Sequence, residues 1–313
     1  MTFVKTISIT AALLVSCAIH AQYTEIINSN RPGASSSAFS VGTNVLQFEA
    51  GPYILEEEHV PLKNSVSGFG IDFSVRYGLL FEQLEILVDG TYQNDTFTDN
   101  RSFITSERDR SNFKSFTIGA KYLIYDPYKH VEEDKPNLYS WKANRQFKLK
   151  SLIPAISIYA GANLDSKDNP YMAPGVEGFS PKVMLATQNN LAGGWVFVTN
   201  FIYNRFTSDY PEFQYIITLT KSITEKWVVF GETQGISNDI YADNLFRLGG
   251  AYLFSKDFQL DSALTFNTKD TPSVFSVNLG ASYRFDFHQD KKIDNNNSAK
   301  DERKRVLNRK GRN

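Results

Sequence analysis

The most constraining feature of the sequence is a strict two-residue alternation near its carboxyl end. From Phe275 to Phe287 every second side chain is apolar, and none of the residues between them is a large apolar one. A two-residue period predicts a β-strand, and this one is about twice as long as the five to six residues usual in soluble proteins. At roughly 3.3 Å per residue and a tilt of about 40°, such a strand crosses a hydrocarbon layer about 25–30 Å thick. The segment therefore indicates a strand of a transmembrane barrel.

The same alternation recurs, less strictly, along the chain. It predicts twelve strands, at residues 44–56, 71–77, 84–93, 112–125, 151–164, 179–190, 194–205, 212–222, 226–237, 243–255, 257–268 and 275–287. An even number of antiparallel strands closes a sheet without edges and returns both termini to one side. We therefore predict an all-β fold, a transmembrane antiparallel up-and-down β-barrel of about 12 strands. The negative mean hydropathy of −0.32 is compatible with this fold because apolar and polar residues alternate.

The connections between the expected strands also alternate in length. Short turns at 78–81, 192–194, 222–225 and 255–257 separate longer loops at 57–66, 95–111, 165–178, 205–211, 238–242 and 269–273. Outer-membrane barrels have short periplasmic turns and longer external loops, so both termini are expected in the periplasm. The long connection 126–150 is an exception on the periplasmic side. Aromatic residues near strand ends, among them Tyr53, Trp195 and Trp227, are expected at the membrane interfaces.

Residues 1–21 have the three-part pattern of a secretory signal peptide. Lys5 precedes an apolar core, and small Ala21 stands at the expected cleavage point. A second interpretation uses Cys17, the only cysteine, as a lipid attachment site, because the residues before it fit the short box of bacterial lipoproteins. In both cases the protein leaves the cytoplasm, and a single cysteine excludes an intramolecular disulfide framework.

The rest of the chain divides into three parts. Residues 22–43 are rich in Ser, Asn and Gly, and we expect an N-terminal periplasmic or plug segment with Arg31 as its charged anchor. The alternative is a flexible leader. Residues 44–287 form the expected barrel, and residues 288–313 form a basic periplasmic tail with nine basic and four acidic side chains. The tail is expected either to be a disordered extension or to bind an anionic cell-wall polymer or a protein.

The net charge of −1 is a cancellation between these parts. Residues 22–287 carry −7 and the tail carries +5. The near-neutral total argues against a nucleic-acid partner, which usually requires a clustered basic excess. An acidic barrel favours cationic or neutral solutes.

Charged residues on the polar face of the expected strands are the candidate pore-lining residues. In a barrel they point into the lumen, where an isolated buried charge is costly and must be hydrated or paired. Two interpretations stay open, a polar conduit and a narrow lumen closed by a salt-bridged network. The candidates are Glu49, Asp72, Arg76, Glu85, Asp89, Lys121, Lys182, Glu232, Arg247, Asp261 and Arg284.

The sequence offers little for catalysis. The three histidines outside the signal peptide are His59, His130 and His288, all in expected loops or in the tail, and they have no metal-site spacing. Motifs for a nucleophile elbow, a phosphate-binding loop and a dinucleotide site are missing from the sequence. We therefore expect no catalytic residues, no metal and no cofactor. A lipid-modifying barrel enzyme is the weakest of the functions considered.

The last expected strand carries a candidate assembly signal. Asn278, Gly280, Tyr283 and Phe285 fit the pattern polar-x-Gly-x-x-aromatic-x-aromatic. This pattern resembles the targeting strand that the outer-membrane assembly machinery reads. It favours a membrane barrel over the alternative of a secreted β-sandwich or propeller.

Several segments resemble the outer-membrane transporter family named after the phenol meta-cleavage degradation pathway, in a Bacteroidota-type form. The resemblance implies an outer-membrane barrel in a Gram-negative bacterium, with outer-membrane lipid as its surroundings and an unknown small-molecule solute. We expect a passive transporter or channel; the alternative is a closed barrel that serves as an anchor or scaffold for periplasmic partners. The matching segments are 30–37, 41–51, 119–122, 152–155, 258–261 and 280–285.

Overall fold

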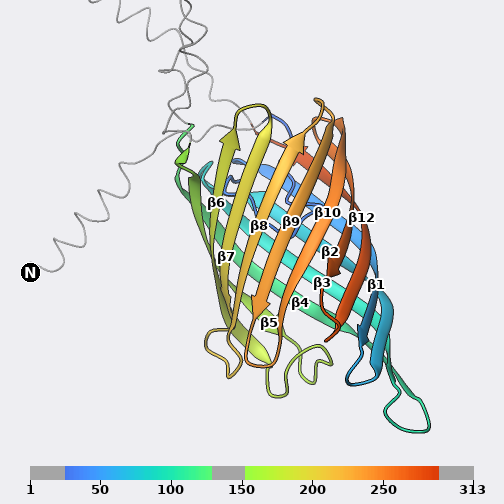
Figure 1. The fold of residues 1–313 in the computed structure, drawn as a ribbon. Coiled ribbons are helices and arrows are strands. Elements are labelled where there is room, and N and C mark those ends of the chain that lie inside the picture. Colours follow the sequence, from blue (N-terminus) through green and yellow to red (C-terminus); the bar gives the residue numbers. More distant parts are fainter. Residues whose placement is uncertain (1–24, 129–151, 289–313) are drawn as a thin grey trace, which may run out of the picture.

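The structure, a computed structural model, describes residues 25–128 and 152–288. They form a closed barrel in which each strand pairs antiparallel with its neighbours in the chain and β1 pairs with β12 (Figure 1). The prediction of a twelve-stranded all-β barrel is confirmed. The expected signal peptide, most of the 126–150 connection and nearly all of the basic tail lie outside the described residues. No helix among the described residues is long and apolar enough to cross a membrane.

The strands are 10 to 20 residues long. Their bounds are β1 Val45–His59, β2 Asn64–Gly78, β3 Leu84–Asp99, β4 Ser106–Tyr125, β5 Ala155–Asp165, β6 Gly178–Leu191, β7 Trp195–Asn204, β8 Glu212–Ser222, β9 Trp227–Ser237, β10 Ala242–Ser255, β11 Phe258–Asn267 and β12 Ser273–Asp286.

The predicted lengths of two long loops are wrong. The expected loop 57–66 is a turn at 60–63, and the expected loop 95–111 shrinks to 100–105. Segments such as Glu56 to Glu58 and Arg108 to Arg110 are charged on both faces, which hides the alternation. They nevertheless pair as strands, because a strand that projects beyond an apolar layer needs no apolar face.

The barrel has two ends. The strands are joined at one end by 79–83, 192–194, 223–226 and 256–257. β12 also ends there, and Ile27 bonds to Lys256 in the last of these turns; we call it the turn end. The opposite end, the loop end, carries 166–177 and 205–211. In the 192–194 turn, Gly193 and Gly194 have φ angles of 78° and 74°, which favour glycine because it has no Cβ.

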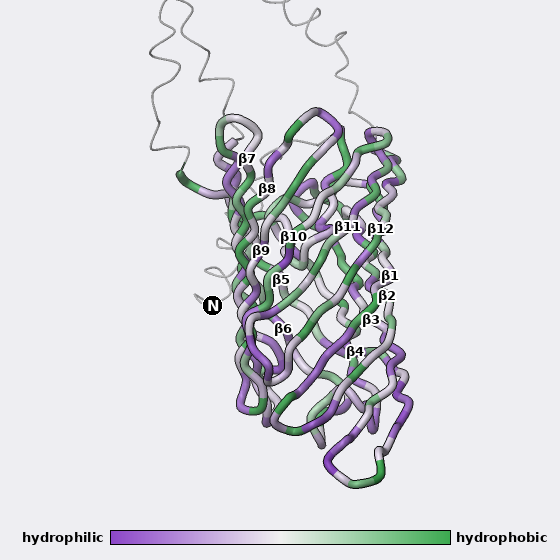
Figure 2. Tube along the Cα trace, turned by 45° about the vertical axis from the view of Figure 1, so that its right-hand side comes forward, coloured by the Kyte–Doolittle hydropathy of each residue, from purple (hydrophilic) through white to green (hydrophobic). Residues whose placement is uncertain are grey.

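The outer face of the barrel is apolar. Hydrophobic and hydrophilic residues alternate along the strands (Figure 2), and successive side chains of a strand point to opposite faces. Large apolar side chains with 37–61% of their surface exposed cover the outside of most strands, among them Phe48, Ile54, Phe69, Ile118, Ile158, Leu185, Phe197, Phe201, Leu219, Val229, Leu248, Leu264, Phe275 and Leu279. An apolar surface of this extent on a barrel matches a lipid-facing band.

Aromatic rings form a continuous girdle on the outside near the turn end. Ring centroids lie 4.8–6.2 Å apart along the series Trp227, Tyr252, Phe254, Phe258, Tyr283, Phe285 and Phe48, which runs from β9 through β12 to β1. Rings at this depth are typical of a membrane interface. Tyr53 does not belong to such a girdle, contrary to expectation. It faces inward, lies over Gly70 and donates to Gln93 Oε1 at 2.9 Å, because the missing Gly70 side chain leaves room for the ring.

Candidate functional site in the barrel lumen

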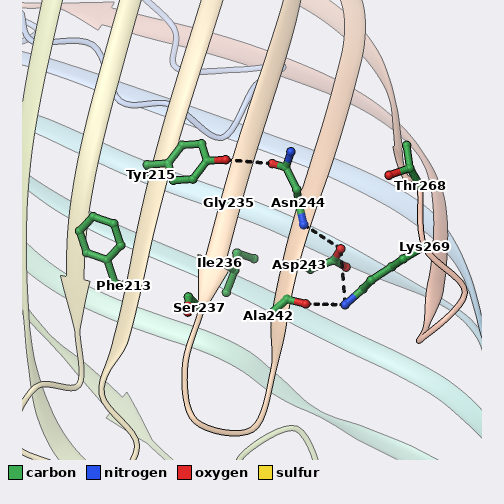
Figure 3. Close-up of a pocket in the computed structure, with 10 residues that line it drawn as sticks. All are labelled: Phe213, Tyr215, Gly235, Ile236, Ser237, Ala242, Asp243, Asn244, Thr268 and Lys269. Carbon is green, nitrogen blue, oxygen red and sulfur yellow. Dashed lines mark hydrogen bonds and ion pairs between the residues drawn. The ribbon is translucent and has the colours of Figure 1, made fainter.

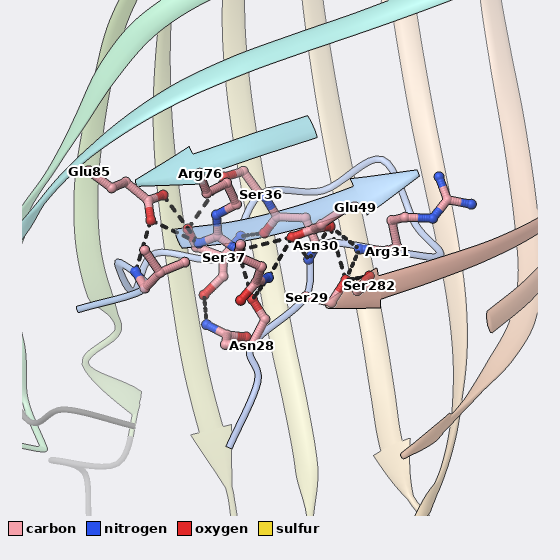
Figure 4. Close-up of polar contacts among 12 residues, drawn as sticks. Asn28, Ser29, Asn30, Arg31, Ser36, Ser37, Glu49, Arg76, Glu85 and Ser282 are labelled. Carbon is pink, nitrogen blue, oxygen red and sulfur yellow. Dashed lines mark hydrogen bonds and ion pairs between the residues drawn. The ribbon is translucent and has the colours of Figure 1, made fainter. Parts of the chain in front are cut away.

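Residues 25–44, called the inner segment below, run inside the barrel near the turn end (Figures 1 and 4). The segment bonds to the β10–β11 turn through Ile27 N and Lys256 O, 2.8 Å apart, and to the end of β2 through Asn44 N and Gly78 O, 3.0 Å apart. Between these points it contacts inward side chains of strands all round the wall. The lumen at this level therefore holds a length of chain as well as side chains.

Four buried charges on β1 to β4 form one ion-pair network. Arg76 lies 3.4 Å from Glu49 and 3.1 Å from Glu85, and Lys121 lies 2.6 Å from Glu85. All four side chains are 0% exposed. Two acids balance two bases, as the high cost of unpaired buried charge requires.

This network holds the inner segment by its backbone (Figure 4). Arg76 donates to Asn28 O at 2.7 Å, and Lys121 donates to Ser37 O at 2.6 Å. Glu85 accepts from Val41 N at 2.9 Å, and Glu49 accepts from the backbone of residues 30 and 31 and from Ser29 Oγ. The bases donate hydrogen bonds to backbone carbonyls, and the acids accept hydrogen bonds from backbone amides. The buried backbone of the segment therefore has hydrogen-bond partners although it forms no helix or strand.

Strands on the opposite side of the barrel hold the middle of the inner segment. Glu232 of β9 accepts from Ala34 N at 3.0 Å and Ser35 N at 3.2 Å, while Arg247 of β10 pairs with Glu232 at 2.9 Å. Asn200 of β7 accepts from Ser36 N at 2.6 Å and donates to Ser36 O at 2.9 Å. The segment is thus fixed from several directions.

Arg31 lies in a cradle made by two glycines. Its guanidinium pairs with Asp261 of β11 at 3.2 Å and bonds to Asn278 of β12. A Cβ at Gly51 or Gly280 would overlap the guanidinium, so the missing side chains on β1 and β12 create the space. Asp261 is 0% exposed at its side chain, which makes Arg31 the counter-charge of a buried carboxylate.

An apolar cluster interrupts the polar inner face farther from the turn end. It comprises Leu87, Tyr159, Met184, Ile202 and Ile216, from β3 and β5 to β8. The Tyr159 ring occupies the space left by Gly119 and Gly161, where a Cβ would overlap it. Lys182 Nζ lies 5.9 Å from the Tyr159 ring centroid. The lumen therefore has an apolar wall beside its charged one.

At the loop end, the 166–177 loop is attached to β3 and β4. Tyr171 Oη donates to Gln93 O at 3.1 Å and to Arg110 O at 3.2 Å. Arg110 lies between the rings of Phe97 and Tyr171, at 5.1 and 5.2 Å, and pairs with Asp95 at 2.7 Å. Burial raises the pKa of the Tyr171 hydroxyl above its ordinary value, with the Asp95 carboxylate as a further cause.

Most of the residues that the sequence singled out meet around the inner segment. Glu49, Arg76, Glu85, Lys121, Glu232, Asp261 and Arg284 bond to it directly, Arg284 through Glu25 O. Arg247 acts through Glu232. Three others lie on the same inward face without a bond to the segment: Asp72 accepts from Thr91 and Asn278, Lys182 lies near Tyr159, and Asp89 shares the inward face of β3 with Glu85.

The candidate assembly signal divides between the two faces of β12. Asn278 and Gly280 point inward to Arg31, and Tyr283 and Phe285 belong to the outer aromatic girdle. Parity along β12 predicts this division. Sequence reasoning missed the backbone-binding role of the network, and also Asn200 and Gln188, which are uncharged and contact Ser36 and Ser37.

One cavity, of about 460 Å³, lies at the loop end on the outer side of β8 to β10, beside Phe213, Tyr215 and Asn244 and near the point where Lys269 approaches Asp243 at 3.6 Å (Figure 3). The other, of about 200 Å³, lies between the inner segment and β7 to β10. Within residues 25–128 and 152–288 no three His, Cys, Asp or Glu side chains gather in a way that could hold a metal ion.

Comparison with known proteins gives a family and loose structural likenesses. The sequence profile of the family described as "Putative MetA-pathway of phenol degradation" matches residues 29–285. No curated protein matches.

Among solved structures, an outer-membrane channel from Pseudomonas putida F1 is 12% identical, with a TM-score of 0.49, over 83% of this chain and 100% of that one. The toluene transporter TodX of Pseudomonas putida is 8% identical, with a TM-score of 0.44, over 85% of this chain and 99% of that one. The translocator domain of the autotransporter NalP from Neisseria meningitidis is 10% identical, with a TM-score of 0.46, over 78% and 89%.

Proposed function

This chain belongs to the family described as "Putative MetA-pathway of phenol degradation", and from that premise we propose that it is a passive channel for small molecules in the outer membrane of a Gram-negative bacterium. The observation that carries the proposal is the division of the barrel into an apolar outer face and a hydrogen-bonding inner face. Such a barrel is stable in lipid because its backbone bonds are closed and its polar side chains face the lumen.

The inner segment is the plug of this channel. Its backbone forms hydrogen bonds with charged side chains of β1 to β4 and β9, and its Arg31 pairs with Asp261. These bonds hold the segment across the lumen near the turn end. We assign the turn end to the periplasm, because four of its five connections have only two to five residues and both ends of the barrel lie there, and short turns are typical of that side. The assembly machinery would read β12 as the chain arrives from the periplasm.

Planar bilayers test the channel and the plug together. The chain from residue 22 onward is expected to give discrete single-channel currents, and a variant that lacks residues 22–40 is expected to conduct at least twofold more. Deletion removes the chain from the lumen but leaves every strand intact. A matched control removes residues 295–310, outside the described part.

The alternative of a closed anchor or scaffold makes the opposite prediction. If both the intact chain and the deletion variant insert but stay silent, and vesicles that contain them show no solute flux, the channel function is wrong. Equal currents from the two chains would leave a channel but contradict the plug.

A further inference from the structure

The cavity beside the inner segment has two unlike sides. Most of its wall is built from short aliphatic, threonine and phenyl side chains of β7 to β10, among them Val196, Val198, Thr218, Thr220, Val228 and Phe230, and Gln188 of β6 and Gln259 of β11 lie at its sides. Its other side is the polar inner segment from Ile27 to Ser37. Of the described residues that line the cavity, Arg31 alone is charged.

The position of the cavity follows from how the inner segment is held. On β1 to β4 the buried ion pairs bind the segment tightly and leave no exposed side-chain surface. On the opposite side Glu232 and Asn200 hold the segment farther from the turn end. Between that level and the turn end, the inward side chains of β7 to β10 are uncharged and form no ion pairs with the inner segment. The cavity lies in this region.

Phe230 closes the deep end of the cavity. The side chains nearest the turn end, Val196, Thr220 and Val228, are half-buried, whereas Val198, Thr218 and Phe230 are 7%, 4% and 8% exposed. The Phe230 ring packs between two glycines: a Cβ at Gly33 would lie 3.5 Å from the ring, and one at Gly249 only 2.7 Å from it. The ring therefore stands between the inner segment and β10.

We propose that solutes pass the inner segment through this cavity, along β7 to β10, and that Phe230 is the residue that restricts the passage. The proposal rests on the channel function above and names its route and solute class. A mostly apolar wall that faces the polar inner segment favours a solute with an apolar body and a hydroxyl or amide group. An engineered apolar cavity of about 150 Å³ holds one benzene, so a cavity of 200 Å³ admits a solute of one ring.

Truncation of Phe230 is the first test. Phe230→Ala is expected to raise single-channel conductance at least twofold with the inner segment still in place, because the ring no longer fills the space between Gly33 and Gly249. Phe201→Ala, the same change on the lipid-facing side of β7, is the control and should conduct like the unaltered chain. Unchanged conductance in Phe230→Ala would overturn the assignment of that residue.

Cysteine labelling tests the route without a change of packing. Cys17 is the only cysteine and lies in the expected signal peptide, so a chain that starts at residue 22 has no background thiol. In Thr220→Cys, a trimethylammonium methanethiosulfonate reagent is expected to lower conductance at least twofold. Ser157→Cys, inward on β5 but 0% exposed, should not react.

Protection identifies the solute class. Cyclohexanol is expected to slow the labelling of Thr220→Cys severalfold, and myo-inositol, the same ring with six hydroxyls, is expected to leave it unchanged. Equal protection by both would contradict the apolar solute class. Full labelling, verified by mass, with undiminished current would overturn the route while leaving the channel function intact. A chain that conducts under no condition would instead contradict the channel function and remove the route with it.

Discussion

At the scale of single residues, Glu85 occupies the centre of the buried ion-pair network. It pairs with Arg76 and Lys121 and also accepts from Val41 N, so it connects β2, β3, β4 and the inner segment. Glu85→Gln keeps the size of the side chain but leaves two bases against Glu49 alone. Loss of one partner from a buried pair costs about 3–5 kcal/mol. We expect the urea midpoint in detergent micelles to fall accordingly, and Glu107→Gln, exposed on β4, to leave it unchanged. Equal midpoints for the two variants would contradict the role of the network.

Arg31 and Asp261 form a pair whose members should depend on each other. Arg31→Ala leaves Asp261 buried without its counter-charge, and Asp261→Ala leaves the guanidinium between Gly51 and Gly280 with Asn278 alone. Each single variant should increase protease cleavage of the inner segment. In the double variant the increase should be smaller than the sum of the two single increases. Coupling of about 0.5–3 kcal/mol is usual for residues in contact. Additive effects would mean that the pair does not hold the segment.

Parity along the strands predicts which side chains face inward, but it does not predict what they meet there. Glu49, Arg76 and Lys121 were assigned to the lumen because they alternate with apolar neighbours. Their partners are carbonyls and amides of residues 28–41, and backbone groups leave no mark in the sequence. The cradle of Arg31 was missed for a related reason, since Gly51 and Gly280 contribute space and no side chain.

At the scale of elements, strands inside the expected apolar layer were easier to predict than those that project from it. The segment 212–222 was predicted with the bounds that β8 has, because Phe213, Tyr215, Ile217 and Leu219 share one parity and only Ile216 is apolar on the other. The first half of β2 was missed, since Gly68 and Gly70 replace large side chains there. That gap has a physical reason, because the ring of Tyr53 takes the place that a Gly70 side chain would occupy.

Side-chain hydrogen bonds attach the 166–177 loop to β3 and β4, from Tyr171 and also from Ser166 and Asn169. Tyr171→Phe removes the hydroxyl that bonds to Gln93 O and Arg110 O. Each hydrogen bond contributes about 1 kcal/mol, so amide exchange in this loop should speed up about fivefold or more. Tyr203→Phe, on the outer face of β7, is the control, and hydrogen exchange read by mass spectrometry is the measurement. Unchanged exchange in 166–177 would show that the loop is held by other contacts.

At the scale of the whole molecule, the seam between β1 and β12 is what makes the sheet a barrel. Ala50 and Ala281 are partners across it, both on the outer face. Directly opposed residues on antiparallel strands lie close enough for a disulfide. In a chain that starts at residue 22, Ala50→Cys with Ala281→Cys should cross-link almost completely on oxidation and shift the band on a non-reducing gel. Ala50→Cys with Ala160→Cys, on distant β5, should not. Cross-linking in neither pair would contradict the closed seam.

The position of the inner segment also orders events in time. Residues 25–44 leave the ribosome before every strand that later surrounds them, yet their partners extend to Arg284, near the end of β12. The ring closes only when that last strand pairs with β1, and a segment that lies within the growing sheet at that moment is enclosed without a separate step of entry. A chain that closed first would have to thread its own beginning through a finished mouth. In the former order of assembly, the N-terminal segment is in place first and the twelve strands close around it.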